Sequence, residues 1–477
     1  MNKWQRNVKL GFQAALTAAL VAIARAQSPA GGTVENVFLA RDSKDVLVFR
    51  NGDYLYGGLL GIDPQSGLRW QHPDAAQPIE FSVANLAEIQ LAPRAETQPP
   101  GWTNNCTVRL VDQDELEGSL TACDAEKLTL ETWYAGRLTI PRKRVEAILV
   151  IPSNIKTVFD GPTGVDGWTI GKVVGAGAET GQWKYKNGAF YATRAASIAR
   201  DLKLPPVATL QFDLAWKGSL YIALALYTDY LQPVNLSTKE SEPDFGAFYS
   251  LQLNNFYANL LPISKLTPLR YLGQISVSAF NQKNSAHVEV KLNKEKRQTA
   301  LFIDGVLLKE WVDPENFTPT GTGLRLVNQG LGAVKLSHLQ ITEWDGLFDE
   351  KLARPPGSKD DLVRLRNADK LTGAFEGIHE GKMTFVNAGK TMVVPLDRIK
   401  EVDLAPVADA GARATNQVRA VFNRRGSVTF ALQKWDAHQV VALSPDFGQA
   451  ELNPAAFSRL EFGTDIEPVK PKPVTTQ

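Results

Sequence analysis

The stretch RNGDYLYGGLLGID, residues 50–63, contains the strongest fold signal in this sequence of 477 residues. Asn51-Gly52 is typical of a tight hairpin turn, because both positions tolerate the positive φ angles that a right-twisted hairpin requires. The preceding DVLVF, residues 45–49, alternates its side chains with the two-residue period of a β-strand. Gly57 falls inside the second apolar run, where a long strand must bend to close a small barrel. The stretch therefore predicts a β-hairpin that opens a small barrel.

The same pattern returns three more times. The second copy begins CTVRLVDQDELEGSL and the third DLVRLRNADKLTGAF, with Gly118 and Gly373 at the position of Gly57. The fourth, QVRAVFNRRGSVTFAL, is looser and lacks this glycine. A five-stranded barrel of about 50 residues is marginal alone. We therefore expect packing in pairs, first copy with second and third with fourth, as they adjoin in the chain. The predicted bounds of the copies are 35–95, 104–152, 358–407 and 415–464.

The segment between the second and third copies, residues 156–346, predicts a larger all-β domain. Apolar runs with alternating side chains, such as TLQFDLAWKG and SLYIALALYTDY, are separated by turn residues, among them Asp304-Gly305. This spacing is typical of a two-sheet sandwich. No convincing helix longer than about ten residues follows the N-terminal segment. The fold class we expect is all-β, a central jelly-roll sandwich flanked by two pairs of five-stranded barrels.

The repeated copies resemble Sm-like barrels, which belong to the SH3-like folds. The resemblance lies in the apolar strand, the polar-glycine turn, the mid-strand glycine and Asp63 six residues after it. RNA-binding Sm-like proteins also carry an asparagine shortly after that aspartate, whereas this chain has Gly67, Lys127 and Lys382 there. The resemblance therefore implies a fold, and RNA binding is not carried over. We interpret the opening stretch as turn and barrel chemistry rather than as a ligand site.

The middle segment is similar to the concanavalin A-like jelly rolls, which include laminin-G and glucanase-type sandwiches. The likeness lies in GQWKYKNGAFY, in HVEVKLN followed by LFIDGVLLKEW, and in the closing GTGLRLVNQGLGAVKLSHLQITEWDG. Some members of that group bind or cleave polysaccharide, and others hold partners. The resemblance implies a sandwich without selecting one of these functions.

Strand alternation divides the side chains of this segment into an apolar set and an opposite set of polar and aromatic residues. If the opposite sets share the concave sheet, their amides, carboxylates and rings form a shallow surface that suits a sugar. A solvated sheet face alternates in the same way, so both interpretations stay open. The candidate ligand-binding residues are Gln211, Asp213, Tyr221, Tyr227, Asp229, Gln252, Asn254 and Phe256.

The sequence gives little support for catalysis or for a resident metal. Retaining glycosidases need two carboxylates about 5 Å apart, and the Glu-x-Asp-x-x-Glu run of the glucanase relatives is absent. The five histidines stand in no metal-ligand spacing, and we interpret them as lone side chains. We predict no catalytic residue and no cofactor. A structural calcium site at a loop end stays open as an alternative, with Asp160, Asp166 and Asp304 as candidates.

The N-terminus has the pattern of a secretory signal peptide. Three cationic residues precede an apolar run of 14 residues, Leu10–Ile23, and Ala24-Arg25-Ala26 follows it. We expect cleavage after residue 26, export to the periplasm, the cell envelope or the exterior, and no transmembrane segment in the mature chain. A Pro-rich disordered tail is expected at 465–477.

Cleavage of the signal peptide would remove four cationic residues and leave the mature chain with a net charge of about −3. The charge of the mature chain therefore does not favour binding to nucleic acid.

Cys106 and Cys123 are the only cysteines. If Asp112-Gln113 is the turn between their strands, both side chains point to one face but are offset along it. Export to an oxidising compartment favours a disulfide, and two small buried thiols are the alternative. The sequence allows the bond without requiring it.

Three functions follow from these observations. The first, which we expect, is an exported non-catalytic scaffold that binds a protein or a cell-envelope component through its sandwich and barrels. The second is a carbohydrate-binding protein that uses the concave face of the sandwich to bind polysaccharide. The third is a glycan-processing hydrolase, for which no carboxylate pair is visible. Nucleic acid is not an expected partner.

Overall fold

The computed structural model describes residues 44–63, 65–92, 104–152, 155–173, 181–277, 280, 284–347, 359–406, 417–423 and 426–463. The predicted signal peptide and C-terminal tail lie outside these residues. The described chain consists of β-strands joined by turns, loops and short 3-10 helices, so the all-β prediction is confirmed. None of the helices in these ranges has both the length and the apolar character needed to cross a membrane.

Each of the four repeats forms a unit of five antiparallel strands. The strand order is fifth, first, second, third, fourth, and a 3-10 helix precedes the fifth strand. Unit 1 contains β1 (Asp45–Phe49), β2 (Tyr54–Asp63), β3 (Gly67–Gln71), β4 (Ile79–Phe81) and β5 (Leu86–Gln90). Unit 2 contains β6 (Asn105–Leu110), β7 (Glu115–Cys123), β8 (Lys127–Thr132), β9 (Gly136–Pro141) and β10 (Val145–Val150). Unit 3 contains β26 (Asp361–Leu365), β27 (Lys370–His379), β28 (Lys382–Asn387), β29 (Lys390–Pro395) and β30 (Ile399–Asp403). Unit 4 contains β31 (Val418–Phe422), β32 (Ser427–Trp435), β33 (Val440–Ser444), β34 (Gly448–Leu452) and β35 (Phe457–Phe462).

The repeated glycine (Gly57, Gly118 and Gly373), which we call the anchor glycine, lies where the third strand of a unit crosses closely over the second. A Cβ atom added to Gly118 would lie 2.5 Å from the carbonyl oxygen of Glu131, and the corresponding approaches at Gly57 and Gly373 are closer still. Only glycine fits such an approach without a shift of the backbone. In unit 4 the equivalent position holds Phe430, whose side chain is fully buried. The core of this unit therefore contains a phenylalanine ring where the other three units have a glycine.

The units pair through their fifth strands, but not with their neighbours in the chain. Strand β5 pairs with β35, with Ile89 opposite Leu460, and β10 pairs with β30, with Ile148 opposite Val402. The ends of the second strands meet in the same two pairs of units. The prediction that unit 1 packs with unit 2 and unit 3 with unit 4 is therefore wrong; unit 1 packs with unit 4, and unit 2 with unit 3.

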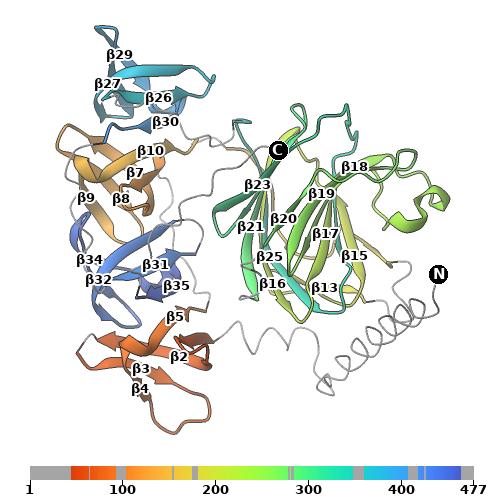
Figure 1. Ribbon diagram of the computed structural model, residues 1–477, viewed down its shortest axis with the longest axis horizontal. Coiled ribbons are helices and arrows are strands. Elements are labelled where there is room, and N and C mark those ends of the chain that lie inside the picture. The colour runs from red at the N-terminus through yellow and green to blue at the C-terminus, as the bar shows by residue number, and fades with distance from the viewer. Residues whose placement is uncertain are drawn as a thin grey trace, which may run out of the picture.

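The two pairs join end to end into a column with the order 3, 2, 4, 1 (Figure 1). The contact between units 2 and 4 is a short one between β7 and β32, with Glu115 opposite Ser427. Beside it the ring of Tyr134 packs against that of Phe422, with centroids 4.7 Å apart. The column thus covers most of the fifth-strand edges that small units would otherwise expose.

The middle segment forms a two-sheet sandwich beside the column (Figure 1). The eight-stranded sheet has the order β13-β14-β25-β16-β21-β22-β23, with β11 on β25. Its strands are β11 (Thr157–Gly161), β13 (Trp183–Lys186), β14 (Ala189–Thr193), β16 (Val207–Lys217), β21 (Ser285–Asn293), β22 (Gln298–Ile303), β23 (Val306–Val312) and β25 (Ala333–Glu343). The seven-stranded sheet, given in its spatial order, contains β12 (Thr169–Gly171), β15 (Ala196–Asp201), β24 (Gly323–Asn328), β17 (Tyr221–Thr228), β18 (Ala247–Asn254), β19 (Tyr257–Ser264) and β20 (Gln274–Ser276).

The core of the sandwich follows the predicted alternation. Leu210, Phe212 and Leu214 on β16 are fully buried against Ile222 and Leu224 on β17. All strands of the sandwich fall within residues 156–346, and those of the four units fall within the ranges predicted for the copies. The domain boundaries themselves stay predictions.

One arginine of unit 3 holds both ends of the sandwich segment to the column. Arg366 Nη2 donates to the carbonyl oxygen of Val150 at 2.6 Å, where unit 2 ends. Its Nη1 donates to Asp345 Oδ2 at 3.1 Å, just after the last strand of the sandwich. Lys400 adds an ion pair with Asp345 at 3.7 Å. The sandwich is therefore an insertion that leaves and rejoins the column at one place.

Replacement of the anchor glycine of unit 1 should destabilise the protein far more than replacement of its neighbour. An added Cβ at Gly57 would collide with the carbonyl of Gln71 and the ring of Trp70, whereas one at Gly58 would meet nothing within 4 Å. We expect Gly57→Ala to lower the free energy of unfolding by about 1–3 kcal/mol, and Gly58→Ala to change it by no more than about 0.5 kcal/mol. Urea unfolding of the two variants measures the difference, and equal effects would contradict the role assigned to Gly57.

Candidate functional site

The outer face of the seven-stranded sheet carries a row of small and polar side chains. Ala223 on β17 lies beside Gln252 on β18, which lies beside Asn259 on β19. The row continues on the other side of Ala223, across β24, to Ser197 on β15. Asn259 Oδ1 and Ser197 Oγ are buried and have no hydrogen-bond partner among the described residues, which is uncommon for buried polar atoms.

Three tyrosines gather at one end of this face. Tyr221 begins β17, Tyr257 begins β19, and Tyr271 lies in the loop between β19 and β20. Burial, and then the nearby hydroxyls of Tyr257 and Tyr271, raise the pKa of Tyr221 above its usual value. Tyr271 is 62% exposed, and Phe256 in the adjacent turn is 65% exposed. We call Tyr221, Tyr257 and Tyr271 the tyrosine cluster.

Asn254 supports this cluster through the turn between β18 and β19. Its Oδ1 accepts from the backbone N–H of Phe256 at 2.8 Å and of Tyr257 at 2.9 Å. This Asx-type turn is a common use of asparagine. Asn254, predicted as a ligand contact, thus positions the aromatic residues that follow it.

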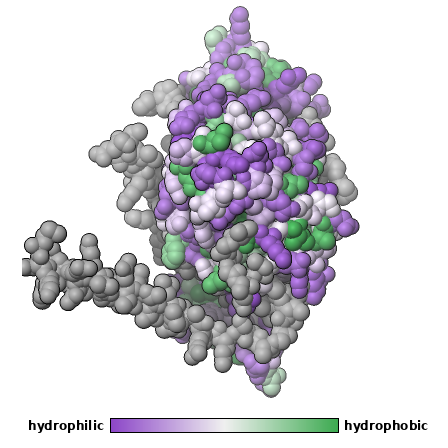
Figure 2. All heavy atoms as spheres, turned by 90° about the vertical axis from the view of Figure 1, so that its right-hand side faces the viewer, coloured by the Kyte–Doolittle hydropathy of each residue, from purple (hydrophilic) through white to green (hydrophobic). Residues whose placement is uncertain are grey.

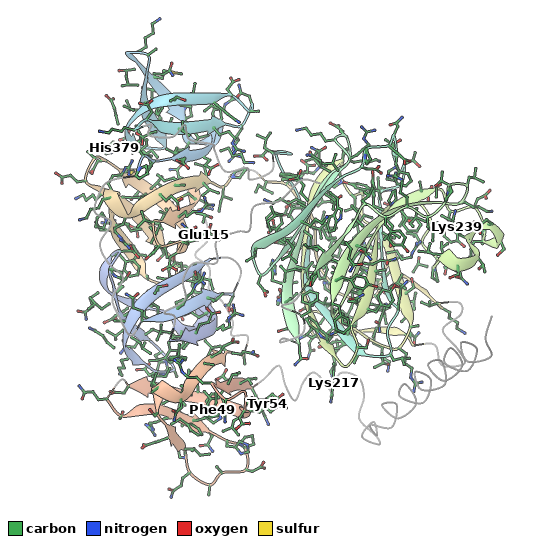
Figure 3. All side chains as sticks on the ribbon, viewed as in Figure 1. Phe49, Tyr54, Glu115, Lys217, Lys239 and His379 are labelled. Atoms are coloured by element: carbon green, nitrogen blue, oxygen red, sulfur yellow. The ribbon has the colours of Figure 1, made fainter. Side chains whose placement is uncertain are left out.

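A long loop between β17 and β18 covers the other half of the same face. Lys239, in the 3-10 helix η3 (Leu236–Ser241), is 3% exposed, and Figure 3 shows it at the far side of the sandwich from the column. Its Nζ donates to the carbonyls of Ser264, Lys265 and Thr267 at 2.5–2.8 Å. Arg325 Nη1 binds the carbonyls of Tyr230 and Gln232. These bonds hold the loop in place over its half of the face. The half that the loop leaves uncovered carries the polar row and the tyrosine cluster.

Figure 2, viewed from this side of the molecule, shows a mainly hydrophilic surface with scattered hydrophobic patches.

Tyr227 and Asp229 do not join this site. Tyr227 has φ +60°, and the pairing of β17 with β24 shifts register there. The ring therefore turns into the core, where it is 1% exposed and its hydroxyl donates to the carbonyl of Pro205 at 2.9 Å. The prediction of Tyr227 as a ligand contact is wrong because alternation fails at a bulge. Asp229 lies just beyond the opposite end of β17 from Tyr221, with its carboxylate against Gly246.

Gln211 and Asp213 lie on the other sheet of the sandwich. They are on β16 of the eight-stranded sheet and point to its outer face, opposite to the core residues Leu210 and Phe212. The expectation that all candidate residues share one concave sheet is therefore wrong. Gln211 Nε2 donates to Gln340 Oε1 at 2.6 Å.

Asp213 bridges two histidines from the neighbouring strands. Its Oδ1 lies 2.8 Å from Nδ1 of His287 on β21, and its Oδ2 lies 2.7 Å from Nδ1 of His338 on β25. His338 has φ +50°, a conformation that non-glycine residues rarely adopt within a strand. No local pattern indicates this group, because the two histidines lie 74 and 125 residues from Asp213 in the chain. Only the strand register brings the three side chains together.

The charges of this group stabilise one another. Burial alone would raise the pKa of Asp213, but hydrogen bonds and charge interactions with His287 and His338 outweigh it and lower the pKa to about 2. Burial would lower the pKa of His287, but the hydrogen bond to Asp213 and its charge raise it above the usual value. At neutral pH Asp213 is therefore a carboxylate acceptor, not a proton donor.

The other sequence predictions concern cysteines and calcium. Cys106 and Cys123 are both free and buried in unit 2, and burial raises the pKa of Cys123 to about 12. Cys106 on β6 lies opposite Gly118 on β7, and Cys123 lies five residues after Gly118 on β7. This offset along the strands separates the two sulfur atoms. The residues proposed for calcium, Asp160, Asp166 and Asp304, are not gathered into a group of ligand atoms in the described chain.

Comparison with known proteins gives structural likeness only. No family model matches the chain, and no curated protein matches it. One similar solved structure is a protein of unknown function with a galectin-like fold from Bacillus subtilis, which is 11% identical, with a TM-score of 0.30 and coverage of 40% of this chain and 98% of that one. The potassium-bound carbohydrate recognition domain of Emp46p has the same identity, score and coverage. The exoplasmic domain of VIP36, in its Ca²⁺- and Man3GlcNAc-bound form, is 13% identical, with a TM-score of 0.30 and coverage of 43% of this chain and 93% of that one.

Removal of the Asp213 carboxylate should change stability in a pH-dependent way. The raised pKa of His287 contributes stability that is complete below its unfolded value of about 6.5 and is lost as the pH rises through its folded value. The lowered pKa of Asp213 contributes stability that is complete above about pH 4 and is lost as the pH falls toward 2. We expect Asp213→Asn to destabilise by about 1 kcal/mol between pH 4 and 6.5, a modest value because the Asp213 side chain is 44% exposed.

Urea unfolding of wild type and Asp213→Asn from pH 3 to 9 measures this window. The control is Asp244→Asn, since the Asp244 side chain is 97% exposed and paired only at the surface with Lys265. A stability difference for Asp213→Asn that does not vary with pH would refute the assignment.

Proposed function

We propose that this protein binds carbohydrate without processing it, through the tyrosine cluster on the sandwich, and that the column of four units is its scaffold. The proposal rests on one observation, the gathering of Tyr221, Tyr257 and Tyr271 beside the polar row that contains Gln252 and Asn259. These residues come from three strands and a loop of one sheet.

The chemistry of this end of the sheet suits a sugar. Aromatic rings offer flat apolar faces to the C–H groups of a pyranose, while phenol and amide groups hydrogen-bond its hydroxyls. Exposed aromatic rings such as Tyr271 and Phe256 are also typical of interaction sites. Polysaccharide is the partner we propose for this surface.

The charge state of Asp213 favours binding over hydrolysis. A glycosidase needs a carboxylic acid whose pKa is raised, so that it can protonate the leaving oxygen. Asp213 has the opposite property, because its two histidine partners keep it ionised, so it does not fit the role of the general acid. We propose a non-catalytic protein.

The scaffold role of the column is supported by its construction. Strand pairing joins units 1 and 4 and units 2 and 3, and Arg366 and Lys400 tie the sandwich to unit 3. After export, which the N-terminal pattern predicts, such a column would hold the sandwich at an envelope component or a partner protein.

Loss of the exposed ring of the tyrosine cluster should weaken glycan binding. We expect the mature protein to bind a subset of glycans on an array, and Tyr271→Ala to weaken binding about five- to tenfold, because stacking on one aromatic ring is worth about 1–1.5 kcal/mol. The matched control is Tyr54→Ala, since Tyr54 is 58% exposed but lies in unit 1. Titration calorimetry with the best glycan gives the affinities.

Two outcomes would contradict the proposal. One is the absence of saturable binding to any polysaccharide or oligosaccharide; the other is an equal effect of Tyr271→Ala and Tyr54→Ala. Release of reducing sugar from a bound glycan, abolished by Asp213→Asn, would replace the binding function with a hydrolytic one.

A further inference from the structure

Three aspartates from two units meet in the middle of the column. Asp112 and Asp114 lie in the turn between β6 and β7 of unit 2, and Asp446 lies in the turn between β33 and β34 of unit 4. One carboxylate oxygen of each lies within 4.8 Å of the others, and no other group of this kind occurs among the described residues. Asp114 is 1% exposed and Asp446 is fully buried. We call these three residues the aspartate cluster.

The protein supplies the cluster with donors but with few charges. Asp114 accepts from Ser427 Oγ at 3.2 Å and from the N–H and hydroxyl of Thr429 at 2.5 and 3.1 Å. The Asp112 carboxylate accepts from the backbone N–H of Asp114 at 3.4 Å. Arg144 binds Asp446 through Nε at 2.5 Å and Asp112 through Nη2 at 3.2 Å. The Arg144 guanidinium therefore pairs with two of the three carboxylates, and Arg419, which donates to Ser427 Oγ, is a more distant cation.

One oxygen of the cluster receives no hydrogen bond from the part of the chain that the structure describes. Asp446 Oδ2 is buried and accepts no hydrogen bond, and its residue has no exposed surface. Burial of an unpaired anionic oxygen is strongly unfavourable. The cluster thus needs positive charge, from protons or from a cation.

We propose that the aspartate cluster binds one divalent cation, Ca²⁺, between units 2 and 4. Three carboxylates outnumber the two nearby guanidinium groups of Arg144 and Arg419, and a cation bound among the carboxylates offsets the remaining negative charge. Asp446 Oδ2 receives no hydrogen bond from the described residues, and one carboxylate oxygen each of Asp112 and Asp114 lies within 4.8 Å of an oxygen of Asp446.

The ligand chemistry selects the type of ion. All three candidate ligands are carboxylate oxygens, and the hydroxyls of Ser427 and Thr429 adjoin Asp114. Hard cations prefer such oxygens, whereas zinc and copper sites in proteins mainly use nitrogen and sulfur. Ca²⁺ accepts irregular geometry more readily than Mg²⁺, which suits ligands from two separate turns.

Calorimetric titration of the mature full-length protein, freed of metal by a chelator, tests the proposal. We expect one Ca²⁺ per chain and a rise of several degrees in the melting temperature at saturating Ca²⁺. Asp446→Asn should weaken the affinity at least tenfold, because it removes a charged ligand while its amide oxygen still accepts from Arg144. Asp436→Asn, which changes an aspartate of the same unit that pairs with Lys434, should leave the affinity unchanged.

Several outcomes would overturn the proposal. One is a melting temperature that does not respond to Ca²⁺, Mg²⁺ or Mn²⁺ but rises on mild acidification, which would show that protons neutralise the cluster. Another is unchanged Ca²⁺ affinity in Asp446→Asn, which would place the ion elsewhere. If Asp446→Asn does not fold, Asp112→Asn provides the same comparison from unit 2, and the wild-type titration already decides whether an ion binds.

Discussion

Pairing between the fifth strands of different units is the constraint on which the rest of the structure depends. A five-stranded unit leaves the outer edge of its fifth strand with unpaired N–H and C=O groups, which are costly to leave buried and prone to aggregation when exposed. Here β5 pairs with β35 and β10 pairs with β30, so the fifth strand of each unit has a partner for part of its outer edge within one chain. This pairing joins units that are distant in sequence, and it makes the sandwich an insertion whose two ends meet at Arg366.

The same arrangement separates the two kinds of chemistry in the molecule. The column has buried charge at its centre, where turns of units 2 and 4 bring the aspartate cluster and Arg144 together. The sandwich has polar and aromatic groups on its outer faces, with Asp213 and its histidines on one sheet and the tyrosine cluster on the other. A binding surface held on a rigid sheet loses little conformational freedom when a ligand binds. In the column, the strand pairing and the Arg144–Asp446 ion pair hold neighbouring units together.

Local sequence patterns predict the strands. They do not predict which distant strands pair, and this pairing decides which side chains and which units lie together. Alternation gave the all-β class and the buried face of β16, and the repeated glycine marked a close approach that the structure contains at Gly118. Alternation failed at Tyr227, where a bulge with positive φ reverses one side chain. It also could not reveal His287 and His338 beside Asp213, the exchange of partners among the units, or the aspartate cluster. Each of these depends on pairing between segments that lie 74 or more residues apart.

A designed disulfide between units 1 and 4 tests the column most directly. Glu88 and Glu461 lie opposite each other in the pairing of β5 with β35, and opposed residues of antiparallel strands are about 4.5–5.5 Å apart at Cα, within the range of a disulfide. If units 1 and 4 pair in this way, Glu88→Cys/Glu461→Cys forms an intrachain disulfide on mild oxidation, detected by mass spectrometry. Glu88→Cys/Leu149→Cys, which would match a pairing of unit 1 with unit 2, should remain reduced. A bond in the second variant and none in the first would contradict the account.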